Sequence, residues 1–302
     1  MKQNYHVSSR LKLVASGLSL VVAAVASAQT LQAISIVGAN NSGYIGAFDQ
    51  AWTNGTTANA SVNRTFTGLD MSGTQQTMGF SAQTITSAQF GQLHSYTTGS
   101  VTNSYYNPAN PDVTDYNGST IFPGGSPKVL DSLGFAIFTD TLQFGGSLQA
   151  GYQARYVFHI DGTNSGTGAA ADLGVDVTGQ GGDAWFNFGN GYYSNTWATK
   201  SFAINGVTPQ DIRVQFSDQV VFNLNDLPEG GSYTGTSDFS STATLTGIRI
   251  VDANGRDVSG VTVSSASGTQ YNVVHGVPAP GCVPMVIGMV GAMVRRMRRQ
   301  SK

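Results

Sequence analysis

IRVQFSDQVVFNL, residues 212–224, carries an apolar side chain at nearly every second position. Successive side chains of an extended strand point to opposite faces, so this spacing predicts a strand with one face buried in a core. The apolar positions are Val214, Phe216, Val220, Phe222 and Leu224. Asp218 breaks the series, and a bulge or turn at residues 217–219 would accommodate it. We therefore expect a hairpin or a bent strand there.

The same alternation recurs along the chain. Tyr156, Phe158 and Ile160 share one face of a second segment, and Val157 adds an aliphatic side chain to the other face, which is typical of a strand inside a sheet. Similar runs bounded by Gly, Asn and Asp cover residues 31–37, 61–69, 77–86, 129–144, 172–178, 184–188, 199–207, 241–251, 258–264 and 270–274. Many short strands at this spacing predict an all-β fold, an antiparallel β-sandwich or jelly-roll-like ectodomain.

Composition supports this fold class. Sixteen of the 17 acidic residues are Asp and only Glu229 is Glu, which favours turns and loops over helices. The 38 glycines point the same way. Cys282 is the single cysteine and lies outside the strand-rich body, so the body must be held by an ordinary buried core rather than by disulfides.

The N-terminal residues have the layout of a secretory signal. A basic leader with Lys2, Arg10 and Lys12 is followed by an apolar run and by small residues at Ala26 and Ala28. Signal peptidase accepts small side chains at these two positions, so we expect cleavage after Ala28, with a signal helix in residues 1–28. The alternative is a transmembrane anchor, for which the run is short of the roughly 20 residues that a bilayer needs.

The C-terminal residues carry a second sorting pattern. It consists of the VPAPG motif with Val277, Pro278, Pro280 and Gly281, an apolar run over residues 283–294, and a basic cluster of Arg295, Arg296, Arg298 and Arg299. This layout resembles the PEP-CTERM class of exosortase-processed proteins, although Ala279 stands where the family usually has Glu. The resemblance implies processing by signal peptidase and an exosortase-like enzyme, and a secreted or cell-surface location in a bacterial envelope.

The length of the tail agrees with that layout on physical grounds. Residues 282–294 would form a helix of about 20 Å, against a hydrocarbon core of about 30 Å. The arginines would stay on the cytoplasmic side and hold the motif near the outer face, so the tail would contact the membrane transiently. The alternative is a simple tail anchor that is never cut. The expected organisation is a signal peptide at 1–28, a β-sandwich ectodomain at 29–276 and a sorting tail at 277–302.

The net charge of residues 29–276 argues against one class of partner. Residues 29–276 hold seven basic residues and all 17 acidic ones, a net charge of −10. An acidic body repels phosphate backbones, so we expect no nucleic-acid partner.

Two stretches offer candidate contacts. Residues 97–127 are rich in Asn, Tyr, Ser and Gly with little periodicity, which predicts a long loop. It is either a surface excursion or a contact loop with Tyr105, Tyr106 and Tyr116. In DAWFNFGNGYYSNTW, residues 183–197, Phe186 and Phe188 can share a core-facing side of a strand. The candidate carbohydrate contacts there are Tyr192, Tyr193 and Trp197, and core packing is the alternative for each of them.

Metal and catalytic patterns are weak. Asp252, Asn254 and Asp257 have oxygen side chains at a spacing that some calcium loops use, but Asn254 and Gly255 also suit a simple turn. The histidines lack zinc spacing, and neither a nucleophile elbow nor a phosphate loop occurs. We expect no cofactor.

The sequence predicts an exported, non-enzymatic structural or binding protein, associated with the cell surface or with an extracellular polysaccharide matrix. Two alternatives remain open. One is a secreted carbohydrate-active enzyme with a pair of Asp carboxylates on a jelly-roll fold, and the other is a calcium-stabilised adhesion module.

Overall fold

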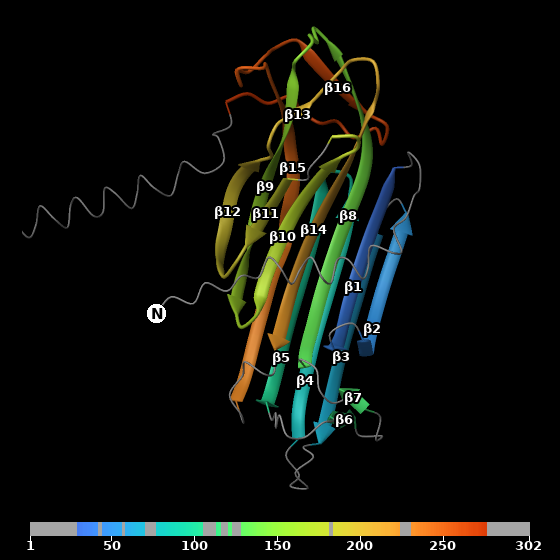
Figure 1. Ribbon diagram of the computed structural model, residues 1–302, viewed down its shortest axis with the longest axis vertical. Coiled ribbons are helices and arrows are strands. Elements are labelled where there is room, and N and C mark those ends of the chain that lie inside the picture. The colour runs from blue at the N-terminus through green and yellow to red at the C-terminus, as the bar shows by residue number, and fades with distance from the viewer. Residues whose placement is uncertain are drawn as a thin grey trace, which may run out of the picture.

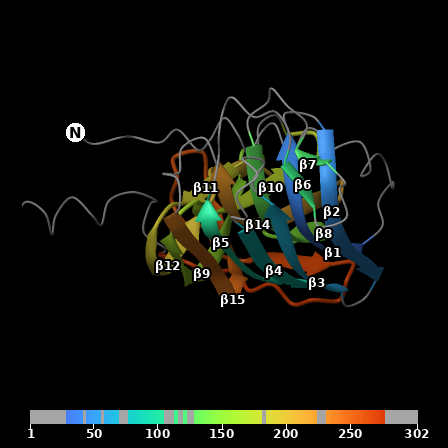
Figure 2. The ribbon, with the colours of Figure 1, turned by 90° about the horizontal axis from the view of Figure 1, so that it is seen from below.

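The computed structural model describes residues 29–41, 44–55, 58–69, 77–104, 113–115, 120–122, 128–180, 184–223 and 231–276. Within these residues the protein is all-β, and two antiparallel sheets pack face to face as a sandwich (Figures 1 and 2). The predicted fold class is therefore confirmed. The expected signal helix and C-terminal helix lie outside the described residues. No helix in the described part of the chain has the length and hydropathy to cross a bilayer.

The first sheet has seven strands. Its order is β11-β10-β14-β8-β1-β2, and β16 pairs with β8. The bounds are Ala184–Phe188 for β11, Ala169–Val177 for β10, Gln210–Asn223 for β14, Lys128–Gly146 for β8, Thr30–Asn41 for β1, Tyr44–Gly55 for β2 and Val261–Ser265 for β16.

The second sheet has nine strands. Its order is β12-β9-β15-β5-β4-β3-β6-β7, and β13 pairs with β9. The bounds are Gly191–Ala198 for β12, Gln153–Gly166 for β9, Gly231–Val251 for β15, Gln92–Ser104 for β5, Thr77–Gln89 for β4, Ala58–Leu69 for β3, Val113–Asp115 for β6, Thr120–Phe122 for β7 and Phe202–Ala203 for β13. Figure 2 shows the two layers from one end.

Strand β14 is continuous, so the predicted bulge or hairpin at residues 217–219 is wrong. From Gln210 to Asn223 it pairs with β8 without a shift in register. Asp218 stays in the inward series because its Oδ1 accepts hydrogen bonds from Ser95 Oγ at 2.5 Å and from Thr97 Oγ1 at 2.8 Å. A carboxylate can occupy an inward position when the facing sheet supplies donors.

Asp218 belongs to a belt of small polar side chains that crosses the interior. Ser35 Oγ lies 3.2 Å from Thr86 Oγ1, and Thr84 Oγ1 lies 2.6 Å from Ser132 Oγ, so β1 and β8 of the first sheet are hydrogen-bonded to β4 of the second. Gly134 leaves room for this layer, since a Cβ there would come within 2.3 Å of Asp218 Oδ1. Hydroxyls thus replace aliphatic packing across the middle of the sandwich.

The rest of the interior is apolar and aromatic. Strand β9 has hydrogen-bonded partners on both sides, as predicted, and buries Tyr156, Phe158 and Ile160. These side chains pack in one core cluster with residues of β8, β10 and β14, including Phe138, Leu173 and Phe216. Burying this apolar area is the main stabilising contribution in a chain without internal disulfides.

Several strands of the structure were not predicted from the sequence. The loop predicted over residues 97–127 is wrong for Thr97 to Ser104, which belong to β5 between β4 and β15, and for the two short strands β6 and β7. The inward residues Ser95 and Thr97 of β5 are polar, so this strand lacks an apolar stripe. Strands β2 and β12 were also missed. Tyr105, Tyr106 and Tyr116 lie outside the described residues.

Candidate functional site

The hairpin from β11 to β12 joins the two sheets at one edge of the sandwich. Strand β11 pairs with β10 of the first sheet, whereas β12 pairs with β9 of the second. Asn164 Nδ2 donates to the carbonyls of Phe188, at 2.7 Å, and Gly189, at 3.1 Å, which fixes the crossing point. Asn190 Nδ2 donates to Gly166 O at 3.1 Å. These bonds set which side chains of β12 face inward.

Two of the three predicted sugar contacts face the core. Tyr193 and Trp197 are half-buried, and their ring centroids lie 5.0 and 5.8 Å from that of Phe188. Tyr193 also stacks on Phe239, with centroids 6.2 Å apart, and its hydroxyl donates to Gly189 O at 2.8 Å. Desolvation by burial raises the pKa of Tyr193. Both rings therefore close the edge of the aromatic core.

The third predicted contact points outward. Tyr192 is 72% exposed and lies directly opposite Thr163 of β9. Thr163 pairs with Asp238 of β15, Asp238 with Tyr96 of β5, and Tyr96 with Ile85 of β4. Directly opposed residues of antiparallel strands share a face, so these five form one line across the outer surface of the nine-stranded sheet. We call Tyr192, Thr163, Asp238, Tyr96 and Ile85 the outer row.

The outer row has two adjacent polar residues, Thr163 and Asp238, with apolar or aromatic surface on either side. Ile85 is 43% exposed, while Thr163, Asp238 and Tyr96 are half-buried. Strands are spaced by about 4.8 Å, so Tyr192 and Tyr96, three strands apart, are separated by about 14 Å along the row. The row thus offers two aromatic surfaces with a carboxylate and a hydroxyl between them.

A bulge in β15 adds polar groups beside the row. The register shifts between Asp238 and Thr242, and Asp238 Oδ1 accepts hydrogen bonds from Ser240 N at 3.1 Å and Ser240 Oγ at 2.6 Å. His94 Nδ1 lies 2.9 Å from Ser240 O. Aromatic faces flanked by such donors and acceptors can stack on sugar rings and bond their hydroxyls.

Of the outer row, the sequence analysis predicted Tyr192 alone, and Tyr96 is the aromatic residue that it missed. The alternation of His94, Tyr96 and Thr98 against Leu93 and Ser95 was available as a signal. This alternation indicates a strand only if Ser and Thr side chains are allowed on the buried face. In the structure they are buried there, because they hydrogen-bond to Asp218 in the polar belt.

The outer face of the other sheet also carries an exposed aromatic residue. Trp185 is 47% exposed, and its ring lies over Gly174, where a Cβ would come within 2.7 Å of it. Asp172, opposite Asn187, is buried on the same face, and this burial raises its pKa to about 6. Trp185 is the one exposed aromatic side chain among those whose exposure is described in β8, β10, β11, β14 and β16 of that sheet.

The calcium candidates take part in a turn. Asp252 Oδ1 accepts hydrogen bonds from Asn254 N at 2.8 Å and Arg256 N at 2.9 Å, and Gly255 has a φ of 77°. Asp257 instead bonds the Arg249 guanidinium and Gly276 N. Within the described ranges, no three His, Cys, Asp or Glu side chains gather in a way that could hold a metal ion.

The predicted processing residues lie outside the described part of the chain. These are Ala26, Ala28, Val277, Pro278, Pro280, Gly281, Arg295, Arg296, Arg298 and Arg299. Gly276, immediately before the motif, is the last described residue.

Comparison with known proteins gives little. No protein-family model matches the chain, and no curated protein does either. Among solved structures, a PA14 sugar-binding domain from an RTX adhesin is similar at 18% identity, with a TM-score of 0.19. The match covers 51% of this chain and 62% of that domain's chain, so the chain corresponds to less than two thirds of it.

Proposed function

We propose that this protein is an exported, non-catalytic β-sandwich that binds a neutral polysaccharide along the outer row. The main support for this proposal is that Tyr192 and Tyr96 are aligned on one outer sheet face. Thr163 and Asp238 lie between them. A flat row suits an extended polymer strand better than a small ligand, because successive sugar rings can each meet one side chain. Export and tail processing rest on the sequence patterns of the two ends.

The charge of the body supports a neutral ligand. Residues 29–276 carry a net charge of −10, and Asp238 lies in the middle of the row. An acidic polymer would meet like charge there, at a cost that favours uncharged sugars. Carboxylates commonly accept hydrogen bonds from hydroxyl groups, so Asp238 suits a neutral sugar.

A glycan array probed with the full chain tests the ligand class. We expect binding to neutral oligosaccharides of several units, and at least tenfold weaker binding to uronic-acid or sulfated polymers of the same length, because of like-charge repulsion. Preferential binding to acidic glycans, or none to any glycan, would overturn the proposed ligand.

Mass spectrometry of the protein recovered from its native cells tests the processing. We expect a mass without residues 1–28 and without the Arg295 to Lys302 cluster, because both ends carry cleavage patterns. A mature mass that still contains the arginine cluster would favour the uncut tail anchor.

A further inference from the structure

One edge of the nine-stranded sheet is open. Strand β12 is the end strand of that sheet, and among the described residues its backbone pairs only with β9. Figure 2 shows β12 at the margin of its layer. Backbone N–H and C=O groups alternate in direction along a strand, so about half of those in β12 point away from β9. These groups can pair with one further strand.

Strand β12 lacks the features that commonly protect a sheet edge. Exposed edges are blunted by short strands, charged side chains, proline or bulges. Strands β7 and β11 have three and five residues, and β2 carries Asp49. Strand β12 has eight residues, contains neither a charged residue nor proline, and pairs with β9 without a shift in register. Its backbone is therefore a regular template for another strand.

The first six residues of β12 are also accessible. Residues 191–196 are exposed apart from Tyr193, which is half-buried. Ala198, at the end of the strand, is buried. A pairing strand therefore has most access to the part of β12 around Ser194.

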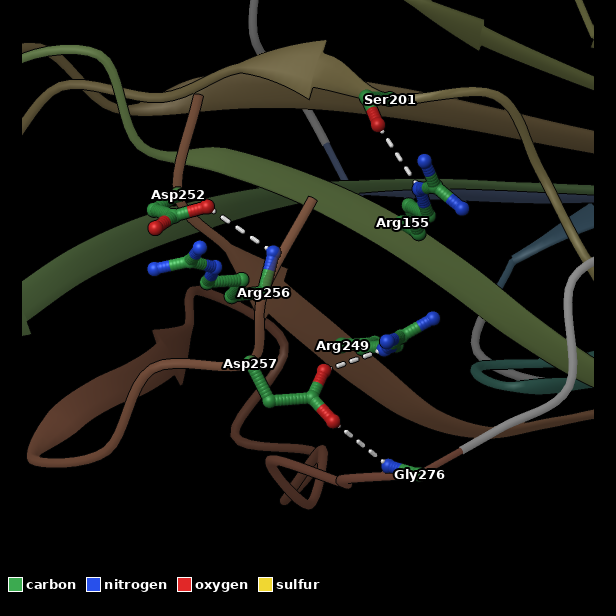
Figure 3. A network of polar contacts seen from close by, with 7 residues as sticks. All are labelled: Arg155, Ser201, Arg249, Asp252, Arg256, Asp257 and Gly276. Carbon is green, nitrogen blue, oxygen red and sulfur yellow. Dashed lines mark hydrogen bonds and ion pairs between the residues drawn. The ribbon is translucent and has the colours of Figure 1, made fainter. Parts of the chain in front are cut away.

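The charge of this edge favours a second copy of the chain as the partner. Residues 184–198, which cover β11, the turn and β12, contain no Asp, Glu, Lys or Arg, on a body of net charge −10. Two copies of an acidic protein repel each other, so they approach most easily where the surface carries no charged side chain. Charged groups resume beyond β12, where Lys200 is exposed and Arg155 Nε donates to Ser201 Oγ at 2.8 Å (Figure 3).

We propose that two copies of this protein associate through β12, antiparallel and about a two-fold axis at Ser194. Directly opposed residues of antiparallel strands share a face, so outward side chains oppose outward ones. With Ser194 on the axis, Tyr192 lies opposite Thr196 of the second copy, and residues 192–196 pair with the same five residues. None of these five is charged, so no like charges oppose each other within the paired segment. Such an interface is self-complementary, as a two-fold dimer requires.

The pairing would bring the outer rows of both copies onto one continuous sheet face. Tyr192 of the second copy would lie opposite Thr196, four residues from Tyr192 along the strand. The two rows would therefore run antiparallel with an offset of about 13 Å, at about 3.3 Å per residue. This consequence rests on the proposed glycan function, whereas the association itself needs no ligand.

Sedimentation velocity of the full chain without glycan, over a range of protein concentrations, tests the association. A sheet-edge contact buries a small interface, so we expect a reversible dimer with a Kd of about 10–100 µM. Ser194→Asp places two carboxylates opposite each other on the axis, beside Asp161 of β9, and should weaken the dimer at least tenfold. Ser194→Thr keeps the position uncharged and suits a strand, so it should preserve the dimer.

The matched control is Ser81→Asp. It adds the same charge at an exposed position of β4, a strand that is paired on both sides with β3 and β5. We expect it to change the Kd less than twofold. An equal effect of the two Asp variants, or a dimer that Ser194→Asp leaves unchanged, would overturn the proposal.

Hydrogen exchange of the same protein locates the contact. Backbone amides within residues 192–196 should exchange more slowly at high protein concentration than at low concentration, because pairing protects those that point away from β9. A monomer at every concentration, or association without added protection in β12, would contradict the proposed interface. Neither measurement contains glycan, so a failure here is distinguishable from a failure of the proposed function.

Discussion

Replacing Tyr96 and Tyr192 together with alanine is expected to weaken neutral-glycan binding about 100-fold, because each aromatic anchor contributes about tenfold or more to affinity. Both rings are outward on the nine-stranded sheet and lie in one cross-strand line. Neither substitution opens a core cavity, since Tyr192 is 72% exposed and Tyr96 is half-buried on the outer face. Titration calorimetry with the best array ligand measures the change.

The matched control for this pair is Trp185→Ala. Trp185 is 47% exposed on the outer face of the other sheet, so removing it tests whether any exposed aromatic ring suffices. We expect less than a twofold change. If Trp185→Ala abolishes binding while the double variant retains it, the ligand lies on the seven-stranded sheet.

The free energy of unfolding is expected to fall as the pH rises from about 4 to about 7, owing to Asp218. Its carboxylate is buried, and this burial raises its pKa to about 7, against 3.8 for an ordinary Asp. The unfolded chain therefore loses this proton at lower pH than the folded protein does. The difference destabilises the fold by roughly 4 kcal/mol once the pH exceeds 7. Asp172, with a pKa raised to about 6, acts in the same direction between pH 4 and 6.

The effect of Asp218→Asn on the free energy of unfolding should depend on pH, with destabilisation at low pH and none at high pH. At pH 4.5 the variant should be less stable by about 1–3 kcal/mol, because the amide nitrogen replaces Oδ2, which has no hydrogen-bond partner among the described residues. At pH 8 it should be as stable as the native protein or more so, since the ionisation penalty is gone. Urea unfolding at the two pH values measures both. Equal destabilisation at both would contradict the raised pKa.

The sequence predicted those strands in which apolar residues occupy every second position. Strands β8, β9 and β14 were found because their inward residues are large and apolar. Strand β5 was missed and Asp218 was misread for one reason: the interior contains a polar belt. The donors to Asp218 Oδ1 come from Ser95 and Thr97, 123 and 121 residues away, so no local pattern indicates that this buried oxygen has hydrogen-bond donors.

The candidate site was predictable in part. Aromatic enrichment pointed to Tyr192, Tyr193 and Trp197, but the side that each faces depends on how β12 pairs with β9. That pairing sends Tyr193 and Trp197 to the core and Tyr192 outward. Tyr96 joins Tyr192 only through the register of four strands, β12, β9, β15 and β5, which composition does not encode.

A crystal structure of the full chain soaked with the best neutral oligosaccharide most directly tests where the ligand binds. We expect sugar rings across β12, β9, β15 and β5, stacked on Tyr192 and Tyr96, with hydroxyls bonded to Asp238. Sugar density over Trp185, with none along the outer row, would contradict the account.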